Sequence, residues 1–565
     1  MLKKRFKLAR ERTETGGIIV KISPSFPDHI VLLDGASLTL ENLARVARNP
    51  HAPVALAETA RSNLHASRAW VETVQKSGEP VVYGVNTGFG SKASVSIPKE
   101  KLRELQRNLI MSHAAGAGDP LPIDAVRAAM LLRANTLARG HSGVRAEVVD
   151  TLLAMLNKGV TPWIPAQGSL GASGDLAPLS HLALVLSRGP EEDPEELSGQ
   201  AYRLDSETGQ WELTGGKTAM ERAGIPRLIL EAKEGLALNN GTPVSTALLA
   251  LACYDARQLV KTADVAMAMT LEALEGFSAA FSPEIQRLRP HPGQVETAEN
   301  IRRLTENSRL LDRRPERVQD AYSLRCHPQV LAGVRDTLRF IENTLAVEMN
   351  AVTDNPLIFP GAPSVNKAVS GGNFHAQPIA FAGDFLSIVL CEVGSIAERR
   401  IFRLSDKHLN AGLPSFLAAN SGLESGLMIA HYTAASLVSE NKSLAHPASV
   451  DSLPTCENQE DHVSMAPIAA RKARQILENV QKIVGVELLY AAQALDLRLR
   501  SEPGGDAAPE TLFGKGTAAA YRALRQKVAF LDRDRPVYRD METARELVWS
   551  GELLAAVEDA VGELR

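Results

Sequence analysis

The chain has 565 residues, which is long enough for a large buried core or for several domains. Its formal net charge of -4 gives no reason to expect a nucleic acid or an anionic membrane as a partner. Charged residues interrupt every long apolar stretch, so we expect a cytoplasmic protein with neither a secretory signal nor a membrane-spanning helix. The 4 cysteines lack Cys-x-x-Cys spacing, which indicates reduced thiols and supports neither disulfides nor a zinc site.

The composition favours a mainly α fold, because alanine and leucine are abundant and aromatic residues make up only 5% of the chain. We predict four parts: an arm at residues 1–30, a mixed N-terminal domain at 31–220, a long central helical bundle at 221–500 and a C-terminal helical region at 501–565. No role is assigned to the arm.

Helical spacing of apolar residues dominates residues 38–76, and a short apolar run then enters a glycine-rich loop at 81–90. The spacing of these glycines does not match a dinucleotide fingerprint. On its residues alone, the loop is read as a surface turn in which Tyr83 is an aromatic anchor.

A well-marked helix is expected at residues 101–115, because apolar residues share one face and glycines and a proline follow. His113 lies in its last turn. A histidine there usually interacts with the negative end of the helix dipole, and the residues alone suggest no other role.

Residues 168–175 read Gly-Ser-Leu-Gly-Ala-Ser-Gly-Asp and precede an apolar run. Asp175 stands at the N-cap position of the helix expected there. Gly174 has no Cβ, so its backbone nitrogen can approach the carbonyl carbon of Ala172, and the Ser173 hydroxyl between them can leave as water. Cyclisation with loss of two waters would give a methylidene-imidazolone, an electrophile made from backbone. The alternative is an ordinary glycine-rich turn or a phosphate-binding loop.

Beyond this loop, a charged segment at 187–216 is expected to form an exposed hairpin, and a helix follows at 231–240. Long helices are expected at residues 244–282, 329–352, 378–402 and 428–444. The first two mix small and apolar residues with few charges, which is typical of helices buried on several sides. Such faces need partners, and a central bundle within a homotetramer would provide them.

Two polar segments, at 319–326 and 446–465, are read as surface loops from their composition. The second contains an acidic run that ends at His462. Adjacent side chains do not converge as spaced metal ligands do, so no metal site is predicted there.

The string from residue 168 to His181 resembles the signature of the aromatic amino acid ammonia-lyase and aminomutase family. The resemblance runs from about residue 35 to the C-terminus and is interrupted mainly at 187–216. It implies a 4-methylidene-imidazol-5-one formed autocatalytically from Ala172, Ser173 and Gly174, with no dissociable cofactor. It also implies a homotetramer with shared active sites.

The same resemblance implies roles for individual side chains. Tyr83 would be the catalytic base and Tyr322 a further catalytic residue, while Arg325 would bind the substrate carboxylate through its planar fork. As a base, Tyr83 needs a pKa below the ordinary value of about 10, which a nearby cation such as Arg325 would provide. The matching positions that would contact the substrate are His113, Asn240, Gln319, Arg325, Phe374 and Glu460.

Two positions favour L-histidine as the substrate. Ser112 and His113 are similar to a pair in histidine ammonia-lyases, whereas phenylalanine-specific relatives carry an apolar residue in place of the histidine. Glu460 lies in a string where tyrosine and phenylalanine relatives lack the glutamate. We therefore expect deamination of L-histidine to urocanate and ammonia. 

Asn239 and Pro243 depart from the histidine-lyase pattern, so the substrate preference has an alternative. A tyrosine or phenylalanine ammonia-lyase, or a 2,3-aminomutase with the same prosthetic group, would suit such a departure. An inactive helical scaffold is a second alternative, although a scaffold has no need of all four of Tyr83, Ser173, Arg325 and Glu460.

Overall fold

The computed structural model describes residues 8–12, 18–22, 29–191, 193–362, 367–418, 420, 422–502 and 508–565. These residues are mostly helical, which confirms the predicted fold class. They form two compact units whose segments interleave along the chain. The first unit comprises Met1–Leu251, Glu342–Asp384 and Pro447–Arg471, and the second comprises Ala252–Ile341, Phe385–His446 and Lys472–Arg565. The predicted four-part division stays a prediction.

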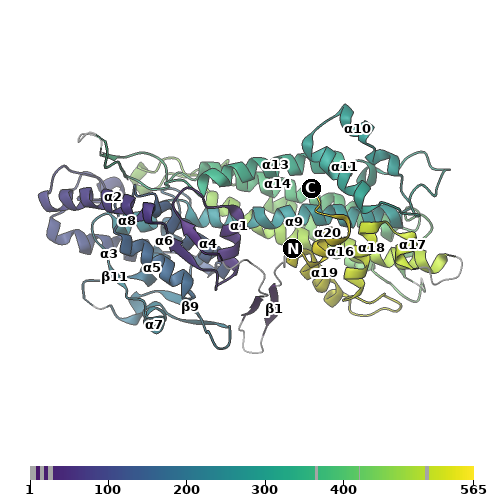
Figure 1. Cartoon of the computed structure of the whole chain (residues 1–565), viewed down its shortest axis with the longest axis horizontal. Coiled ribbons are helices and arrows are strands. Elements are labelled where there is room, and N and C mark those ends of the chain that lie inside the picture. Colours follow the sequence, from purple (N-terminus) through teal and green to yellow (C-terminus); the bar gives the residue numbers. More distant parts are fainter. Residues whose placement is uncertain are drawn as a thin grey trace. The chain divides into compact units, whose positions relative to one another are not determined.

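Short helices form most of the first unit. They are α1 (Leu40–Arg48), α2 (Glu58–Ser77), α3 (Leu102–His113), α4 (Ile123–Ala138), α5 (Ala146–Asn157), α6 (Leu176–Leu186), α7 (Gly216–Arg222) and α8 (Glu234–Asn239) (Figure 1). Every residue of α4 from Ala125 to Ala138 is buried, and α1 and α5 pack against it. Helix α4 therefore lies in the core of this unit, and its two buried arginines, Arg127 and Arg133, donate to the backbone carbonyls of Leu156 and Ala237.

Small sheets connect these helices. The parallel pairs are β3 (Val31–Leu33) with β4 (Val54–Leu56) and β8 (Ser187–Arg188) with β11 (Leu228–Ile229). The antiparallel pairs are β1 (Leu8–Arg12) with β2 (Ile18–Ile22), β5 (Ala117–Pro120) with β7 (Pro165–Gln167), and β12 (Leu357–Ile358) with β13 (Ala368–Val369).

The expected hairpin within residues 187–216 is confirmed. Strands β9 (Gln200–Leu204) and β10 (Trp211–Gly215) are antiparallel, with Trp211 opposite Leu204. Strand β6 (Val160–Pro162) adds to β9 and completes a three-stranded sheet.

The helical pattern at residues 38–76 contains an unexpected strand. Helix α1 stops at Arg48 because Asn49 precedes a proline, which disfavours helical geometry at that residue. The chain then forms β4. The Val54 N–H donates to Asn157 Oδ1 at 3.0 Å, and Asn157 Nδ2 donates to the Val54 carbonyl at 2.9 Å. Helical periodicity in the sequence could not reveal a three-residue strand between two helices.

Four long helices lie close to their predicted positions. They are α9 (Pro243–Ala273), α13 (His327–Glu348), α14 (Gln377–Ser405) and α15 (Met428–Leu444). A further long helix, α16 (Ala466–Ser501), falls within the predicted bundle but was not predicted as an element. Helix α9 ends nine residues earlier than its expected end at residue 282, and the chain soon takes a left-handed conformation at Glu275 (φ 51°). Helix α14 is long and apolar enough to cross a membrane by composition, but 61% of its apolar window is buried inside the protein, as in a core helix.

The second unit adds shorter helices to its share of the long ones. They are α10 (Pro283–Leu288), α11 (Pro292–Leu304), α12 (Tyr322–Arg325), α17 (Pro509–Leu512), α18 (Lys515–Arg525), α19 (Tyr538–Ser550) and α20 (Glu552–Val561). A buried charge network crosses this unit: Asp264 contacts His327 and Arg335, and Arg400 binds the Glu487 carboxylate. Burial lowers the pKa of His327 to about 4, so His327 is neutral at physiological pH.

Candidate active site

The tripeptide Ala172-Ser173-Gly174 lies in the loop between β7 and α6, and Gly241 holds it on both sides. The Gly241 N–H donates to the Ser173 carbonyl at 3.1 Å, and the Gly241 carbonyl accepts from the Asp175 N–H at 2.6 Å. Gly174 has φ +75°, and a Cβ there would lie 2.0 Å from the Gly241 oxygen. Only glycine fits this position.

A second segment, just before α16, holds the start of the loop. The Met465 N–H donates to the Leu170 carbonyl at 2.9 Å, and the Ser464 hydroxyl donates to the Gly171 carbonyl at 3.0 Å. The loop is therefore fixed by segments far from it in the sequence.

Asp175 stands at the start of α6 as predicted, but its side chain does not cap that helix. Its carboxylate instead accepts from the N–H groups of Val244 and Ser245, both at 2.8 Å, and from the Ser245 hydroxyl at 2.6 Å. Asp175 is thus the cap of α9. The positive ends of two helix dipoles, those of α6 and α9, consequently lie beside the tripeptide.

These contacts fit a tripeptide that cyclises to an imidazolone. Gly241 binds the Ser173 carbonyl and the Asp175 N–H, which lie on the two sides of Gly174. The Gly174 N–H itself donates no hydrogen bond to any residue that the structure describes. This nitrogen is the atom that has to attack the carbonyl carbon of Ala172.

Glu460 lies against the tripeptide. The Ser173 hydroxyl donates to Glu460 Oε1 at 3.1 Å, and the Thr455 hydroxyl donates to Oε2 at 2.8 Å. Thr455 and Glu460 also exchange two backbone hydrogen bonds, which close the loop between them. The carboxylate is fixed at the tripeptide with both oxygens engaged.

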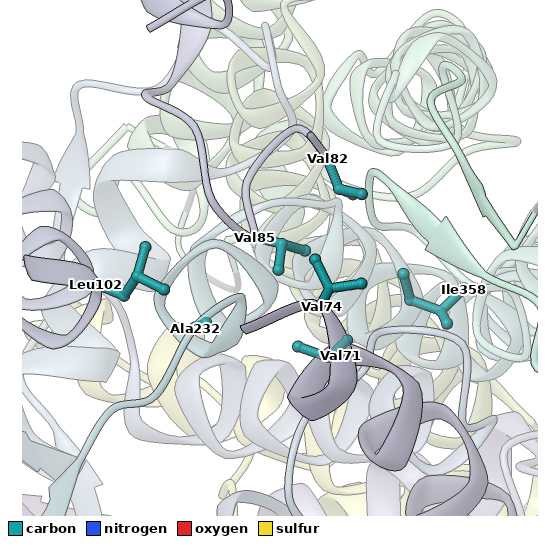
Figure 2. Close-up of a cluster of buried hydrophobic side chains, with 7 residues drawn as sticks. All are labelled: Val71, Val74, Val82, Val85, Leu102, Ala232 and Ile358. Carbon is teal, nitrogen blue, oxygen red and sulfur yellow. The ribbon is translucent and has the colours of Figure 1, made fainter. Parts of the chain in front are cut away.

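Tyr83 is half-buried in a loop that is anchored on the core. Val82 and Val85 flank it and pack into a cluster with Val71 and Val74 of α2 (Figure 2). The Gly90 N–H donates to the Tyr83 hydroxyl oxygen at 3.1 Å.

The environment of Tyr83 does not provide the expected low pKa. Burial raises the pKa of Tyr83, and the acidic groups Cys456, Glu460 and Asp354 raise it further, against a smaller lowering by the Gly90 N–H. The effect of the Glu460 charge on the pKa of Tyr83 indicates that the two residues lie near each other.

His113 ends α3, as predicted, and is half-buried. Its Nδ1 lies 3.0 Å from the Ser112 hydroxyl. Burial lowers the pKa of His113, and the Glu460 charge opposes this effect, which indicates that the two residues are near each other. The chain leaving α3 is tied to α6 by a 3.1 Å hydrogen bond from the Gly116 N–H to His181 Nε2.

Asn240 precedes Gly241 and is buried at the end of α8. Its side-chain nitrogen donates to Asp354 Oδ1 at 3.1 Å. The two residues that depart from the histidine-lyase pattern have structural roles. The Asn239 side chain donates to Ser180 of α6 at 3.2 Å, and Pro243 is the first residue of α9, a position that suits proline.

Phe374 is half-buried in a turn of the first unit. The next residue, His375, lies 3.2 Å from the His462 carbonyl, and the two histidine rings stack with centroids 5.8 Å apart. Because His462 follows Glu460 by two residues, these contacts join the turn of Phe374 to the Glu460 segment.

Gln319, Tyr322 and Arg325 belong to the second unit. The Arg325 guanidinium lies over the Tyr322 ring, 4.7 Å from its centroid, and Arg325 Nε donates to the Asp320 carbonyl at 2.8 Å. Tyr322 is 70% exposed. The roles of these three residues stay predictions.

Comparisons with known proteins agree with this arrangement. The family described as aromatic amino acid lyase matches residues 38–526. The chain belongs to this family. Histidine ammonia-lyase of Caldanaerobacter subterraneus subsp. tengcongensis is 51% identical over 524 residues, which cover 93% of this chain and 97% of that protein.

Solved structures of aromatic amino acid lyases and aminomutases share the fold. The crystal structure of histidine ammonia-lyase from Trypanosoma cruzi matches with a TM-score of 0.84 and 40% identity, over 95% of this chain and 96% of that one. Tyrosine aminomutase from Streptomyces globisporus matches with a TM-score of 0.85 and 38% identity, over 95% and 100% of the two chains.

Sequence reasoning missed three residues that support the site. Thr455 holds Glu460, and the buried pair Lys233 and Asp354 holds Asn240. Thr455 and Asp354 lie in strings that resemble the family, but the resemblance gave them no role, and Lys233 and Asp354 are 121 positions apart. Lys233 stands between Glu231 and Glu234, so nothing in the local sequence distinguishes it from an ordinary surface lysine.

Proposed function

We propose that this aromatic amino acid lyase eliminates ammonia from L-histidine and releases urocanate. The reaction removes a proton from the β-carbon, forms a carbon–carbon double bond and breaks the bond from the α-carbon to nitrogen. No oxidant or dissociable cofactor is needed for this balance.

The position of Glu460 carries the proposal. Its carboxylate lies 3.1 Å from the Ser173 hydroxyl and near His113, so an acceptor for an imidazole N–H stands beside the residues that form the electrophile. An imidazole ring donates such a hydrogen bond, whereas a phenyl ring has no donor. This difference supports histidine over phenylalanine.

The imidazolone proposed to form from residues 172–174 would supply an electrophile that makes nitrogen a better leaving group or the β-hydrogen more acidic. Tyr83 is proposed to accept the β-proton at its hydroxyl oxygen. Because burial raises its pKa, Tyr83 needs a cation supplied on substrate binding or assembly before it can act as a base near neutral pH. Arg325 is proposed to bind the substrate carboxylate.

The proposed assembly is a cytoplasmic homotetramer with shared active sites. Its support is an apolar surface in the second unit, where Phe340, Phe385 and Ile388 are 52%, 41% and 47% exposed around a cavity of about 690 Å³. Exposed apolar surface of this kind is typical of an interface. Light scattering on the purified protein tests the expected mass of four chains.

Two measurements test the proposed function. The intact mass should lack two waters, and this loss should disappear in Ser173→Ala. Incubation with L-histidine should raise the near-ultraviolet absorbance through urocanate. A chain that keeps both waters would contradict the enzymatic proposal, and turnover of tyrosine or phenylalanine without histidine would favour the tyrosine or phenylalanine alternatives.

A further inference from the structure

Lys233, in the first unit, has two features that lower the stability of a folded protein. Its side chain is fully buried, and it has a left-handed backbone conformation (φ 76°) that non-glycine residues rarely adopt. Its ammonium lies 2.7 Å from Asp354 Oδ2, and both side chains are completely shielded from solvent. Buried ion pairs often contribute little net stability, and strained residues cluster at functional sites. Stability alone is therefore a poor explanation for this pair.

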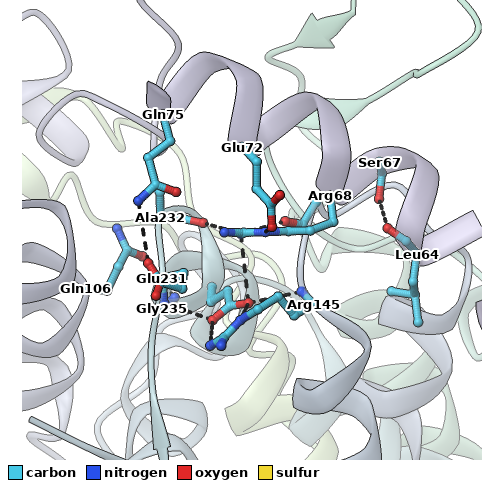
Figure 3. A network of polar contacts seen from close by, with 12 residues as sticks. Leu64, Ser67, Arg68, Glu72, Gln75, Gln106, Arg145, Glu231, Ala232 and Gly235 are labelled. Carbon is cyan, nitrogen blue, oxygen red and sulfur yellow. Dashed lines mark hydrogen bonds and ion pairs between the residues drawn. The ribbon is translucent and has the colours of Figure 1, made fainter. Parts of the chain in front are cut away.

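The residues on both sides of Lys233 are held by arginine side chains. Arg68 Nη1 donates to the Ala232 carbonyl at 3.0 Å (Figure 3). Arg145 donates to the buried Glu234 carboxylate at 2.8 and 2.7 Å. These contacts restrain the segment that carries Lys233, whose ammonium is held by Asp354. Asp354 is consequently held by a group that cannot easily move.

The Asp354 carboxylate determines how the Asn240 amide is oriented. Asn240 Nδ2 lies 3.1 Å from Asp354 Oδ1 and 3.4 Å from the Asn355 carbonyl. Both partners are acceptors, so the amide nitrogen has to face them and the amide oxygen has to face away. None of the described residues donates a hydrogen bond to Asn240 Oδ1.

We infer that Lys233 and Asp354 are positioning residues that hold Asn240 as a hydrogen-bond acceptor for the amino group of the substrate. The inference rests on the proposed function and names how the same site recognises the group that leaves. Asn240 directly precedes Gly241, the residue that holds Ser173 and Asp175 through its backbone. The residue that follows Asn240 therefore lies against the tripeptide in the folded chain.

The chemistry of the amino group agrees with an acceptor at this position. An ammonium or an amine presents N–H donors, and an amide NH₂ turned toward an ammonium would be repelled. The Lys233 ammonium donates to Asp354 Oδ2 and Asn240 Nδ2 donates to Asp354 Oδ1, so each oxygen of Asp354 faces a donor. These two hydrogen bonds set the donor and acceptor roles of all three side chains.

Ligand binding to an unreactive protein tests the inference. In a Ser173→Ala background, isothermal titration calorimetry would compare L-histidine with 3-(imidazol-4-yl)propionate, which has the same ring and carboxylate but no amine. The test variant is Lys233→Met with Asp354→Leu, which removes both charges and the acceptor. Its matched control is Lys233→Met with Asp354→Asn, which removes both charges and keeps an acceptor oxygen toward Asn240.

The acceptor-free variant should bind L-histidine about tenfold more weakly than the parent and should bind the amine-free analogue as the parent does. The control should bind both ligands close to the parent. Equal weakening for both ligands, or no weakening for L-histidine, would overturn the inference, because a purely structural ion pair cannot distinguish the two ligands.

Two further measurements keep this test separate from folding and from the proposed function. If the acceptor-free variant does not fold, as judged by circular dichroism, Asn240→Leu in the same background replaces it and should show the same selective loss. If the wild-type protein deaminates another aromatic amino acid instead of histidine, that amino acid and its own amine-free analogue replace the pair. The comparison isolates the amino group of the substrate, so its result does not depend on which aromatic ring the substrate carries.

Discussion

Among single residues, Glu460 is the one that we propose to set the substrate choice. Replacing it by glutamine removes the negative charge beside Ser173 while keeping the size of the side chain. We expect kcat/KM for L-histidine to fall by roughly 10- to 100-fold, because one hydrogen bond to a charged group is lost. Steady-state kinetics of Glu460→Gln measure this.

Glu457→Gln is the matched control for that substitution, because Glu457 is exposed in the same loop. It should leave kcat/KM unchanged. A Glu460→Gln enzyme as active on histidine as the wild type would contradict the role of the carboxylate.

Gly174 offers a second prediction at the residue scale. In Gly174→Ala, the new Cβ would collide with backbone, since the Gly241 oxygen lies 2.0 Å from its position. We expect the loop to shift and the two waters to be retained, which intact mass spectrometry detects. Gly361→Ala has open space around its Cβ and should mature normally. Full dehydration of Gly174→Ala would show that the close contact with Gly241 is not required.

The sequence pointed to Ser173 and Glu460 better than to the residues that hold them. Both are recognisable in their strings, and the structure brings them within hydrogen-bond distance although they are 287 positions apart. Thr455 and Asp354 act only through contacts formed in the folded chain, so the strings that contain them gave them no role. The pKa of Tyr83 likewise depends on burial, which periodicity does not measure.

At the scale of elements, the cap that Asp175 supplies to α9 joins two helices. In Asp175→Ala, the N–H groups of Val244 and Ser245 lose their buried acceptor, so we expect a loss of about 1–2 kcal/mol of stability. Amide hydrogen exchange at Val244 and Ser245 should become faster.

Thr39→Ala is the corresponding control, because Thr39 caps its own helix, α1, through the Asn42 N–H. It should lower stability slightly without changing exchange at Val244. Unchanged exchange at Val244 and Ser245 in Asp175→Ala would mean that the cap of α9 does not depend on this carboxylate.

Long helices were predicted well, and elements defined by pairing were not. Helix α15 spans residues 428–444 as expected, because neither glycine nor proline interrupts these residues and good helix formers such as alanine and leucine recur among them. Strand β4 has three residues and forms because β3 lies beside it, a relation that a local pattern does not contain. The side chain of Asp175 was assigned to the wrong helix for the same reason.

At the scale of the whole molecule, Glu272 ties α9 to the start of α18 across much of the sequence. Its Oε1 accepts from the Gly514 N–H at 2.7 Å, and burial raises its pKa from 4.5 to about 7. A raised carboxyl pKa favours the protonated form in the folded state. The stabilisation is therefore complete below pH 4.5 and is lost as the pH rises through 7.

Glu272→Gln should remove the dependence of stability on pH that Glu272 causes. Relative to the variant, the wild type is expected to lose up to about 3 kcal/mol of stability between pH 4.5 and 7. Melting temperatures of both proteins over this pH range measure the difference, and Glu100→Gln at an exposed position is the control. Parallel melting curves for Glu272→Gln and wild type would contradict the raised pKa.

The interleaving of the two units could not be predicted from composition. The Leu38 N–H donates to the Asn350 side chain at 2.9 Å, so a residue 312 positions away completes the first unit. The mainly α fold and the long helices follow from local preferences, whereas the assignment of segments to units depends on contacts between distant parts of the chain.

The hydrogen bond from Ser464 to Gly171 spans 293 residues, and this separation bears on when the proposed imidazolone would form. During synthesis at roughly 5–20 residues per second, the tripeptide leaves the ribosome on the order of tens of seconds before the segment that holds it. If cyclisation requires that segment, the nascent chain carries an ordinary serine until the segment has folded. The proposed electrophile would then be formed only where folded protein surrounds it and limits its reaction with cellular amines and thiols.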